Sequence, residues 1–347
     1  MKAVRVHAYG QQPSIDDVEE PTINGPLDVL VEIGAAGLCR TDLHVVEGQW
    51  AAIQDPTLPY TLGHENAGWV REVGSAVTNV APGDAVILHP LVTCGLCGAC
   101  RIGQDSHCDN ASFPGLNVNG GMADLLLTNA RAVVKLQPNL QPADVAALAD
   151  AGLTAYHAVR KSLDLLTPGT HAVVIGAGGL GHIGVQVLAA LTSATITVID
   201  RSSEARELAG SIGADHTLDA NQTDDQILTQ VRDITDGGAH VTFDFVGEHG
   251  TPTTGVAMLR NRGSYYTIGY GGEVKIPTIE LISREINVVG NLVGTYHDLV
   301  ELMTLTAQGR VTLHTRTYPL DAALDAFHDL ESGTLVGRGI LVPKNAS

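Results

Sequence analysis

The chain has 347 residues, more than one hydrophobic core of ordinary size accommodates, so we expect two domains. Its formal net charge of −18 argues against nucleic acids and anionic membranes as partners, because both attract basic surfaces. The composition therefore favours a protein that acts on small molecules.

Short segments separated by Gly, Pro, Asn and Asp fill the first part of the chain. Residues 1–10 alternate apolar and polar side chains and lack the apolar run of a signal peptide, so we expect an opening strand and a cytoplasmic protein. Residues 29–33 and 69–73 alternate in the same way. The pattern predicts a mostly β domain over residues 1–149.

Two candidate metal ligands lie within the first 65 residues. Cys39 is part of Gly37-Leu-Cys-Arg-Thr-Asp-Leu-His44, and His64 stands between Gly63 and Glu65. The glycine allows close approach to the histidine, and the flanking carboxylate can support the metal or bind it. A lone histidine is more often an ordinary core or surface residue, so His64 alone does not establish a site.

Four cysteines follow in a glycine-punctuated stretch. Their spacing, Cys-x-x-Cys-x-x-Cys-x7-Cys, is typical of a structural zinc site, in which four thiolates complete the tetrahedral coordination. The ligands would be Cys94, Cys97, Cys100 and Cys108, in a lobe over about residues 90–110. Two disulfides are the alternative, which a reducing compartment disfavours. Of the five cysteines, only Cys39 is left for other chemistry.

A different pattern begins near Asp150, where apolar segments alternate with helix-like stretches. The apolar segments are residues 172–175, 195–199, 241–246 and 264–268. Such alternation is typical of a parallel sheet with crossover helices. We therefore expect a doubly wound domain over residues 150–289 and a return to the first domain over residues 290–347.

A glycine-rich turn joins the first of these segments to a helix-like stretch. The segment Val173-Val-Ile-Gly176-Ala-Gly178-Gly179-Leu180-Gly181 matches the dinucleotide fingerprint, whose glycines let a pyrophosphate approach the helix N-terminus. Asp200 stands 24 positions after Gly176, where the ribose-binding acid is expected. Its carboxylate would repel a 2′-phosphate, which favours NAD. Arg201 and Arg206 leave NADP as an alternative.

The stretch Ile286-Asn-Val-Val-Gly-Asn-Leu-Val293 has the character of an edge strand. Such a strand pairs readily with its own copy across a two-fold axis. We expect a homodimer or a homotetramer.

In this order, the motifs resemble the zinc-dependent alcohol dehydrogenases of the medium-chain dehydrogenase/reductase superfamily, and bacterial NAD-dependent secondary alcohol dehydrogenases among them. The resemblance covers nearly the whole length of the chain. The matching pieces are Gly37-x-Cys39-x-Thr41-Asp42 with His44, Gly63-His64-Glu65, Gly74, Pro82-Gly83-Asp84 with Val86, the four-cysteine lobe, Gly120-Gly121-Met122-Ala123, Gly152-Leu-Thr154-Ala-Tyr156 and the glycine fingerprint. The resemblance implies an α/β protein with a mostly β, GroES-like catalytic domain and a doubly wound Rossmann domain.

The resemblance also implies a catalytic zinc ion with three protein ligands and one open position. Cys39 and His64 are the first two. The usual third ligand of the family is a second cysteine, but the matching position here is Asp150. A carboxylate carries the same single negative charge as a thiolate and binds zinc through oxygen. Asp150 is thus the expected third ligand, and Glu65 is the alternative.

Further roles follow from the resemblance alone. Thr41 and His44 would relay the alcohol proton, a task for which the ordinary pKa of histidine is suited. Trp50, Leu116 and Leu292 would line the substrate pocket, although most Trp and Leu residues are simply core. Residues expected at the cofactor, besides those of the fingerprint and Asp200, are Arg40, Thr154, Arg201, Val246, Ile268, Gly269, Leu292 and Arg338.

The resemblance implies oxidation of primary or secondary alcohols to aldehydes or ketones, with hydride transfer to NAD. Polyol, formaldehyde and aryl-alcohol dehydrogenases are alternatives within the superfamily. A zinc-independent quinone reductase would share the fold but would not need Cys39, His64 or the four-cysteine lobe. A non-enzymatic binding protein would need no complete open metal site.

Overall fold

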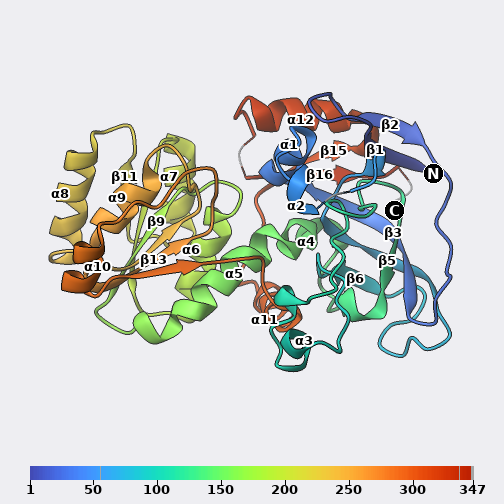
Figure 1. The fold of residues 1–347 in the computed structure, drawn as a ribbon, viewed down its shortest axis with the longest axis horizontal. Coiled ribbons are helices and arrows are strands. Elements are labelled where there is room, and N and C mark those ends of the chain that lie inside the picture. The colour runs from blue at the N-terminus through green and yellow to red at the C-terminus, as the bar shows by residue number, and fades with distance from the viewer. Residues whose placement is uncertain (55, 336, 345–347) are drawn as a thin grey trace. The chain divides into compact units, whose positions relative to one another are not determined.

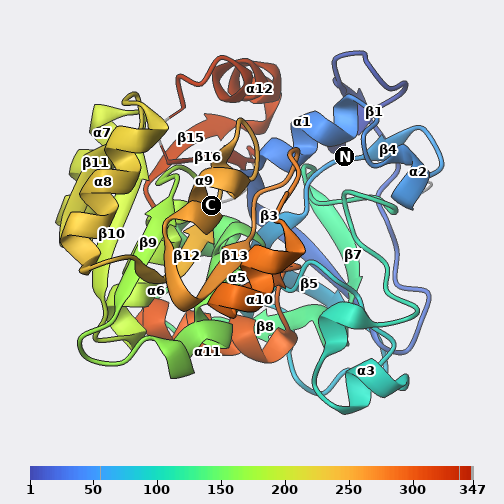
Figure 2. The same cartoon turned by 60° about the vertical axis from the view of Figure 1, so that its left-hand side comes forward.

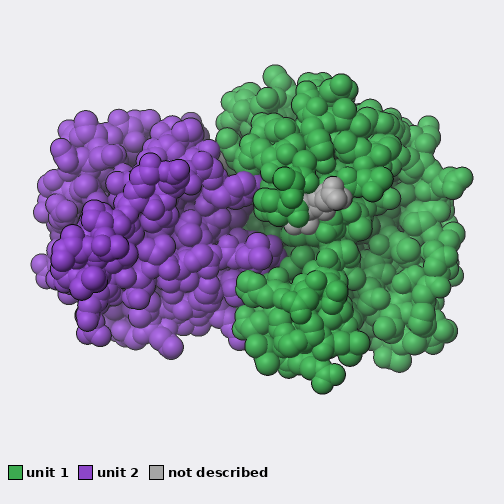
Figure 3. All heavy atoms as spheres, in the orientation of Figure 1, with its two compact units in different colours: residues 1–153, 295–307, 313–347 green, residues 154–294, 308–312 purple. Residues whose placement is uncertain are grey.

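The computed structural model describes residues 1–54, 56–335 and 337–344. It divides into two units, coloured separately in Figure 3. Unit 1 comprises residues 1–153, 295–307 and 313–347, and unit 2 comprises residues 154–294 and 308–312. Within the described ranges, none of the helices combines the length and apolar character needed to cross a lipid bilayer.

Unit 1 is built on β-strands, which form two sheets among the described residues (Figure 1). The smaller has the order β2-β1-β4: β1 (Lys2–Val6), β2 (Ser14–Asp17) and β4 (Tyr60–Thr61). The larger has the order β15-β16-β3-β5-β6-β8, with β7 also paired to β3. Its strands are β3 (Asp28–Leu38), β5 (Glu65–Val73), β6 (Ala85–Leu88), β7 (Leu125–Asn129), β8 (Val133–Lys135), β15 (Thr315–Pro319) and β16 (Arg338–Val342).

Strand β3 is the axis of the larger sheet. It pairs antiparallel with β5 along most of its length, with β7 at its first half and with β16 at its end. Val31, Ile33 and Leu38 on this strand are fully buried in the main core of the unit. The end of β3 is therefore a rigid point from which the next residue, Cys39, projects.

Short helices complete unit 1. They are α1 (Arg40–Val46), α2 (Ala51–Gln54), α3 (Gly98–Arg101), α4 (Pro142–Val145), α11 (Tyr296–Ala307) and α12 (Ala323–Glu331), with 3-10 turns at Asp105–His107, Ala130–Ala132, Ala146–Ala149 and Leu320–Ala322. Helix α5 (Ala151–Ser162) crosses from unit 1 to unit 2.

Unit 2 contains a parallel sheet of six strands among its described residues, in the order β11-β10-β9-β12-β13-β14. The strands are β9 (His171–Ile175), β10 (Thr195–Asp200), β11 (His216–Asp219), β12 (Ala239–Asp244), β13 (Leu259–Thr267) and β14 (Asn287–Gly290). The order reverses between β9 and β12, the position at which doubly wound sheets bind nucleotides.

Five helices follow the strands of unit 2 in the described part of the chain: α6 (Gly181–Leu191), α7 (Ser203–Ser211), α8 (Asp224–Thr235), α9 (Thr251–Ala257) and α10 (Thr278–Arg284), with a 3-10 turn at Leu163–Leu165. Helix α7 packs beside β11, at the edge of the sheet (Figure 2), and helix α8 packs beside β12. Apolar residues such as Val173, Ile199 and Val231 fill the space beneath them.

The units divide a few residues away from the predicted boundaries at 149 and 290. Residues 290–294 remain with unit 2 because Gly290 still pairs with Thr267 in the sheet. Residues 308–312 belong there as well, since the Gln186 side chain bonds the backbone of Thr312 at 2.9 Å.

Candidate active site and metal centres

Cys39 joins β3 to α1 and is buried. Its backbone is extended, with φ −112° and ψ 155°, and its N–H donates to Asp42 Oδ2 at 2.8 Å. Asp42 is the third residue of α1, so its carboxylate caps this helix as in the second half of a capping box. This bond fixes the backbone from which the thiol projects.

His64 immediately precedes β5, and the glycine before it determines its position. Gly63 has φ +101°, and a Cβ atom there would lie 2.5 Å from the backbone nitrogen of Met122. Only glycine permits this conformation and this close approach. The imidazole is consequently held at the start of a central strand, where it is 1% exposed.

Asp150 stands between a 3-10 turn and α5 and completes the group. One ligand atom from each of Cys39, His64, Glu65 and Asp150 lies within 4.8 Å of all the others. The first three are buried, and Asp150 has a side chain 14% exposed. One face of the group is thus more open than the rest.

Carboxylates flank both ring nitrogens of His64. Nδ1 lies 3.3 Å from Asp42 Oδ1, and Nε2 lies 3.5 Å from Asp150 Oδ2. Neither contact has hydrogen-bond geometry, and the ring nitrogens have no other hydrogen-bond partner within the described residues. Burial disfavours the imidazolium, but Asp42 and Asp150 outweigh it and raise the pKa of His64 well above its ordinary value. The carboxylates around His64 therefore favour a positive charge at this position.

Glu65 is fully buried and already engaged. Its Oε1 accepts the backbone N–H of Ala151 at 3.0 Å, and its Oε2 forms an ion pair with Arg338, which is 4% exposed. Burial raises the pKa of Glu65, whereas Arg338 opposes this shift. Both Glu65 oxygens thus bind other groups of the protein, whereas Asp150 Oδ2 faces His64 Nε2 at 3.5 Å, so Asp150 is the better candidate for the third ligand.

The donor chemistry of this group fits zinc. A thiolate sulfur, an imidazole nitrogen and a carboxylate oxygen are the three ligand types that Zn²⁺ takes in proteins, and three protein ligands leave one position open. Asp42, beside Nδ1, is suited to orient the ring from behind. The residues that would hold the ion are Cys39, His64 and Asp150.

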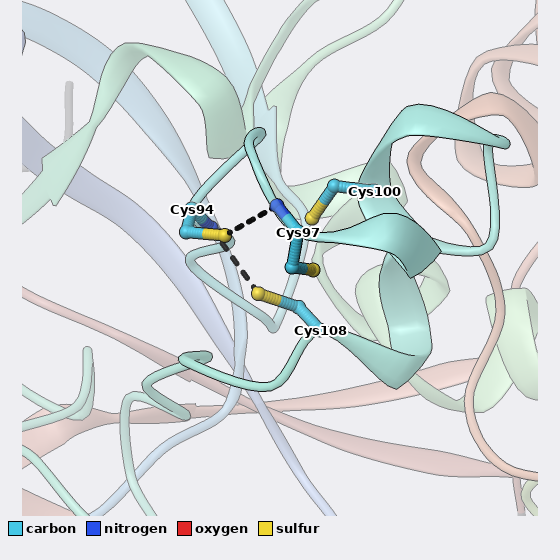
Figure 4. A group of neighbouring side chains, drawn as sticks. All are labelled: Cys94, Cys97, Cys100 and Cys108. Atoms are coloured by element: carbon cyan, nitrogen blue, oxygen red, sulfur yellow. Dashed lines mark hydrogen bonds between the residues drawn. The ribbon is translucent and has the colours of Figure 1, made fainter.

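The second candidate metal-binding group is the four-cysteine lobe of unit 1 (Figure 4). The Sγ atoms of Cys94, Cys97, Cys100 and Cys108 all lie within 4.8 Å of one another. All four are free thiols. Backbone N–H groups of Leu96 and Cys97 donate to Cys94 Sγ at 3.4 Å.

Hydrogen bonding and burial act on these thiols in opposite directions. The N–H groups of Leu96 and Cys97 lower the pKa of Cys94 to about 6. Burial first, and the neighbouring Cys108 and Cys97 thiols after it, raise the pKa of Cys100 to about 12. A divalent cation would remove the repulsion among four thiolates, so this group fits a closed structural zinc site.

The glycine fingerprint lies in unit 2 between β9 and α6. Gly176 has φ +84°, and a Cβ atom at Gly181 would lie 1.8 Å from the carbonyl oxygen of Gly176. A Cβ atom at Gly178 would instead meet nothing within 4 Å. The turn is therefore tight at its base and open at Gly178, where a pyrophosphate would approach.

Asp200 ends β10, the strand next to β9. Its Oδ2 accepts the backbone N–H of Ala177 at 2.7 Å, and its Oδ1 accepts that of Ser202 at 2.8 Å. The carboxylate is thus fixed beside the glycine turn. The guanidinium of Arg206 is held by the carbonyl oxygens of Asp200 and Arg201.

Comparison with known proteins places both halves of the chain in one family. Residues 25–138 match the alcohol dehydrogenase GroES-like domain, and residues 179–308 match the zinc-binding dehydrogenase family. An NAD-dependent alcohol dehydrogenase of Sulfolobus acidocaldarius is 36% identical over 98% of this chain and 99% of its own length. This chain belongs to the zinc-binding alcohol dehydrogenase family.

Solved structures agree with the family assignment. The alcohol dehydrogenase of the hyperthermophilic archaeon Aeropyrum pernix has a TM-score of 0.95 and 45% identity, covering 99% of this chain and all of that one. The D-arabinose dehydrogenase of Sulfolobus solfataricus has a TM-score of 0.84 and 31% identity, with 99% of this chain covered. The predicted family, fold class and enzyme class are confirmed, and the cofactors of this class are zinc and NAD.

The proposed proton relay lies on α1 of this alcohol dehydrogenase. Thr41 and His44 are three positions apart on the helix, which puts them on neighbouring parts of one face. Trp50 packs partly buried against the core of unit 1, and Leu116 is 2% exposed within that core. Their proposed contact with substrate stays a prediction.

The proposed cofactor contacts fall in both units. Arg40 begins α1, and Arg338 is buried against Glu65, where its contact with the pyrophosphate stays a prediction. The unit 2 residues lie on α5 or after β9, β10, β12, β13 and β14; they are Thr154, Gly179, Leu180, Arg201, Val246, Ile268, Gly269 and Leu292.

Two site residues were not predicted from the sequence. The ring of Phe113 meets that of His64 edge to face, with centroids 6.1 Å apart. Asp42 was matched as part of a motif but given no role, although it touches both Cys39 and His64. The sequence signal for Asp42 was its position three residues after Cys39, as in a capping box. Phe113 lies in an irregular stretch that carried no such signal.

Proposed function

We propose that this chain oxidises primary or secondary alcohols to aldehydes or ketones, and reduces them in reverse, with NAD as the hydride carrier. The observation that supports this most directly is the convergence of Cys39, His64, Glu65 and Asp150 in one largely buried group. A bound zinc ion would supply Lewis acidity at this group, and NAD⁺ would accept the hydride.

The chain's own residues hold and orient the reactants. Cys39 and Asp150 supply two negative charges, which balance a divalent cation, and the Asp42 carboxylate lies behind His64, 3.3 Å from Nδ1. The Glu65–Arg338 pair is neutral as a whole, so it adds no net charge to the site. The side of the group at Asp150 is the more exposed one, and substrate would enter from there.

Thr41 and His44 are proposed to remove the alcohol proton. The Thr41 hydroxyl accepts it from the substrate hydroxyl as it gives up its own proton, and His44 takes up the relayed proton and releases it to water, since histidine side chains ordinarily titrate near neutral pH. Their spacing of one helical turn supports a shared route along one face of α1.

The test is an initial-rate panel of primary, secondary, cyclic and aryl alcohols, formaldehyde and polyols, each with NAD⁺ and NADP⁺. The apolar side chains proposed for the pocket, Trp50, Leu116 and Leu292, favour medium-sized apolar alcohols. Such walls discriminate weakly between substrates that differ by one methylene, so related alcohols should differ by only about 10- to 200-fold. Failure of every alcohol would refute the proposal.

Sugar oxidation is the second candidate. A D-arabinose 1-dehydrogenase (NADP(+)) of Saccharolobus solfataricus is 34% identical over 99% of this chain. A pentose that outperforms all simple alcohols in the panel, with NADP⁺ preferred, would favour this alternative.

Asp200 is proposed to select NAD over NADP. Asp200→Ser should reduce the NAD⁺ to NADP⁺ ratio of kcat/KM by about 10-fold or more, because hydrogen bonds to a charged group are worth about 1.5–3 kcal/mol and the repulsion of a 2′-phosphate disappears. Initial rates with both cofactors measure the ratio. Asp215→Asn is the control, since Asp215 accepts the N–H of Ile196 at 2.8 Å near the start of β10, away from the Asp200 end of that strand. An unchanged ratio in Asp200→Ser would contradict the assignment.

We propose that two chains pair through β14. This strand lies at the edge of the sheet, and Val288 on it is 43% exposed. Light scattering should give at least a dimer for the natural chain, and Val288→Lys should shift it toward the monomer because a charge blocks edge pairing. Leu324→Lys, which changes a residue 39% exposed on α12, serves as control. A monomeric natural chain would refute the proposal.

A cytoplasmic location is proposed as well. The cysteines of both metal-binding groups are free thiols, and zinc binding needs them reduced. Reducing compartments maintain that state. Fractionation of the native cells with detection of the chain would test the location.

A further inference from the structure

A buried carboxylate of unit 2 has no part in the reaction described so far. Asp244 is the last residue of β12 and is 0% exposed. A carboxylate with no access to water is costly unless hydrogen-bond donors surround it. The donors around Asp244 therefore indicate what the residue holds in place.

The side chain of Asp244 binds its own loop and the neighbouring strand. Oδ1 accepts the backbone N–H groups of Val246 and Gly247, each at 2.9 Å. Oδ2 accepts the hydroxyl of Tyr265, on β13, at 2.7 Å. Burial raises the pKa of Tyr265, as does the Asp244 carboxylate, so the tyrosine keeps its proton and remains a donor.

The backbone of Asp244 binds a second loop. Its carbonyl oxygen accepts the N–H of Ile268 at 3.0 Å and that of Gly269 at 2.9 Å. One residue thus fixes the segments that follow both β12 and β13. These are the carboxyl ends of parallel strands, where doubly wound sheets bind their ligands.

The two loops touch each other and the glycine turn. A Cβ atom at Gly247 would lie 2.1 Å from the backbone carbon of Gly269, so the loops meet through their backbones. A Cβ atom at Gly176 would lie 2.7 Å from Val246 Cγ2. The glycine turn is also fixed from its other side, by the bond from the Ala177 N–H to Asp200 Oδ2 at 2.7 Å, so its conformation does not depend on the Asp244 loop alone.

We propose that Asp244 is a positioning residue for the nicotinamide half of the cofactor, acting through Val246 and the Ile268–Gly269 loop. It does not touch the cofactor itself, because it is fully buried. The inference depends on the proposed cofactor contacts of Val246, Ile268 and Gly269. The adenosine half is held elsewhere, by Asp200 and the glycine turn, so the two halves of the ligand should respond differently.

Asp244→Asn keeps the shape of the side chain but removes its charge. If the amide oxygen stays with Val246 and Gly247, the amide nitrogen faces Tyr265, whose hydroxyl must then turn to accept. The loop bonds lose their charge assistance, and charge-assisted hydrogen bonds are about twice as strong as neutral ones. Affinity for NAD⁺ should fall about 10-fold, whereas affinity for ADP-ribose, which lacks nicotinamide, should change less than about 2-fold.

Tyr265→Phe is a milder second variant that tests the same carboxylate if Asp244→Asn does not fold. It removes one donor to Oδ2 and leaves both loop N–H groups in place, so NAD⁺ affinity should fall about 3-fold and ADP-ribose affinity should not change. Thr235→Val is the matched control. Thr235 Oγ1 accepts the N–H of Gly238 at 2.9 Å at the opposite, amino end of β12, so its loss should lower the melting temperature without changing the ratio of the two affinities.

Isothermal titration of the 347-residue chain with NAD⁺ and with ADP-ribose measures these ratios, and circular dichroism checks the fold. A selective loss of NAD⁺ affinity in Asp244→Asn or Tyr265→Phe, and not in Thr235→Val, supports the proposal. Equal weakening of both ligands, or no weakening in a folded variant, would overturn the positioning role alone. A natural chain that bound neither ligand would overturn the cofactor assignment too.

Discussion

Cys39→Ser is expected to abolish alcohol-dependent NADH formation while the protein remains folded. Serine is close to cysteine in size, but its hydroxyl is a far weaker ligand than a thiolate, so the group around His64 would lose its metal. Lewis-acid stabilisation is worth several kcal/mol, and each 1.36 kcal/mol is a factor of ten in rate. Turnover should therefore fall about a thousandfold or more. Absorbance of NADH during alcohol oxidation measures it.

The fold should survive because the Cys39 backbone is held independently of the thiol. The bond from its N–H to Asp42 and the pairing of β3 with β5 and β16 do not involve sulfur. Metal analysis should then give one zinc ion per chain instead of two, with a nearly unchanged melting temperature. A fully active Cys39→Ser protein would refute the ligand assignment.

Cys97→Ser, the same chemical change at the other group, should have the opposite outcome. The lobe consists mainly of α3, with four residues, and a 3-10 turn of three. Its apolar residues Leu96 and Ile102 are 73% and 75% exposed. The lobe therefore buries little apolar surface that could stabilise its fold without the metal. Structural zinc contributes about 10–16 kcal/mol in small domains, and loss of even a third of this would lower the melting temperature by about 10 °C.

The damage should extend beyond the lobe. Asp105, within it, accepts the backbone N–H of Tyr296 at 3.1 Å at the start of α11. Differential scanning calorimetry and limited proteolysis of Cys97→Ser, with Cys39→Ser as its matched control, would detect this. A normally stable Cys97→Ser protein with two zinc ions would show that the lobe is not a structural metal site.

The order of several motifs along the chain was sufficient to predict the family and the fold class. Motif spacing predicted both kinds of cofactor, because the four-cysteine lobe and the glycine fingerprint each consist of residues close together in sequence. The four cysteines span only residues 94–108, and the fingerprint spans residues 176–181. In both cases local geometry dictates the chemistry, so a pattern of a few residues carries the information.

Contacts between segments far apart in sequence could not be predicted from motif spacing. Glu65 and Arg338 are 273 positions apart, and only the pairing of β16 with β3 and of β3 with β5 brings them together. The edge-to-face contact of Phe113 with His64 likewise depends on an irregular segment whose path the sequence pattern does not define.

Two glycines inside a strand also led to an error in its predicted length. The alternating pattern predicted a strand over residues 29–33, whereas β3 continues to Leu38 through Gly34 and Gly37. A Cβ atom at Gly37 would lie 2.1 Å from Glu65 Oε2, so this glycine leaves room for the carboxylate. It permits close approach inside a strand and does not mark a turn.

The distance in sequence between Glu65 and Arg338 has a consequence for biosynthesis. A ribosome releases the segments of Cys39, His64 and Asp150 long before β16, so until then the Glu65 carboxylate lacks its positive counterpart. The nascent polypeptide therefore passes through an interval in which its four-sulfur lobe can already capture metal while the catalytic pocket carries an uncompensated charge. The four-sulfur lobe, residues 94–108, does not involve that ion pair, so only the catalytic pocket waits for Arg338 before its charges are balanced.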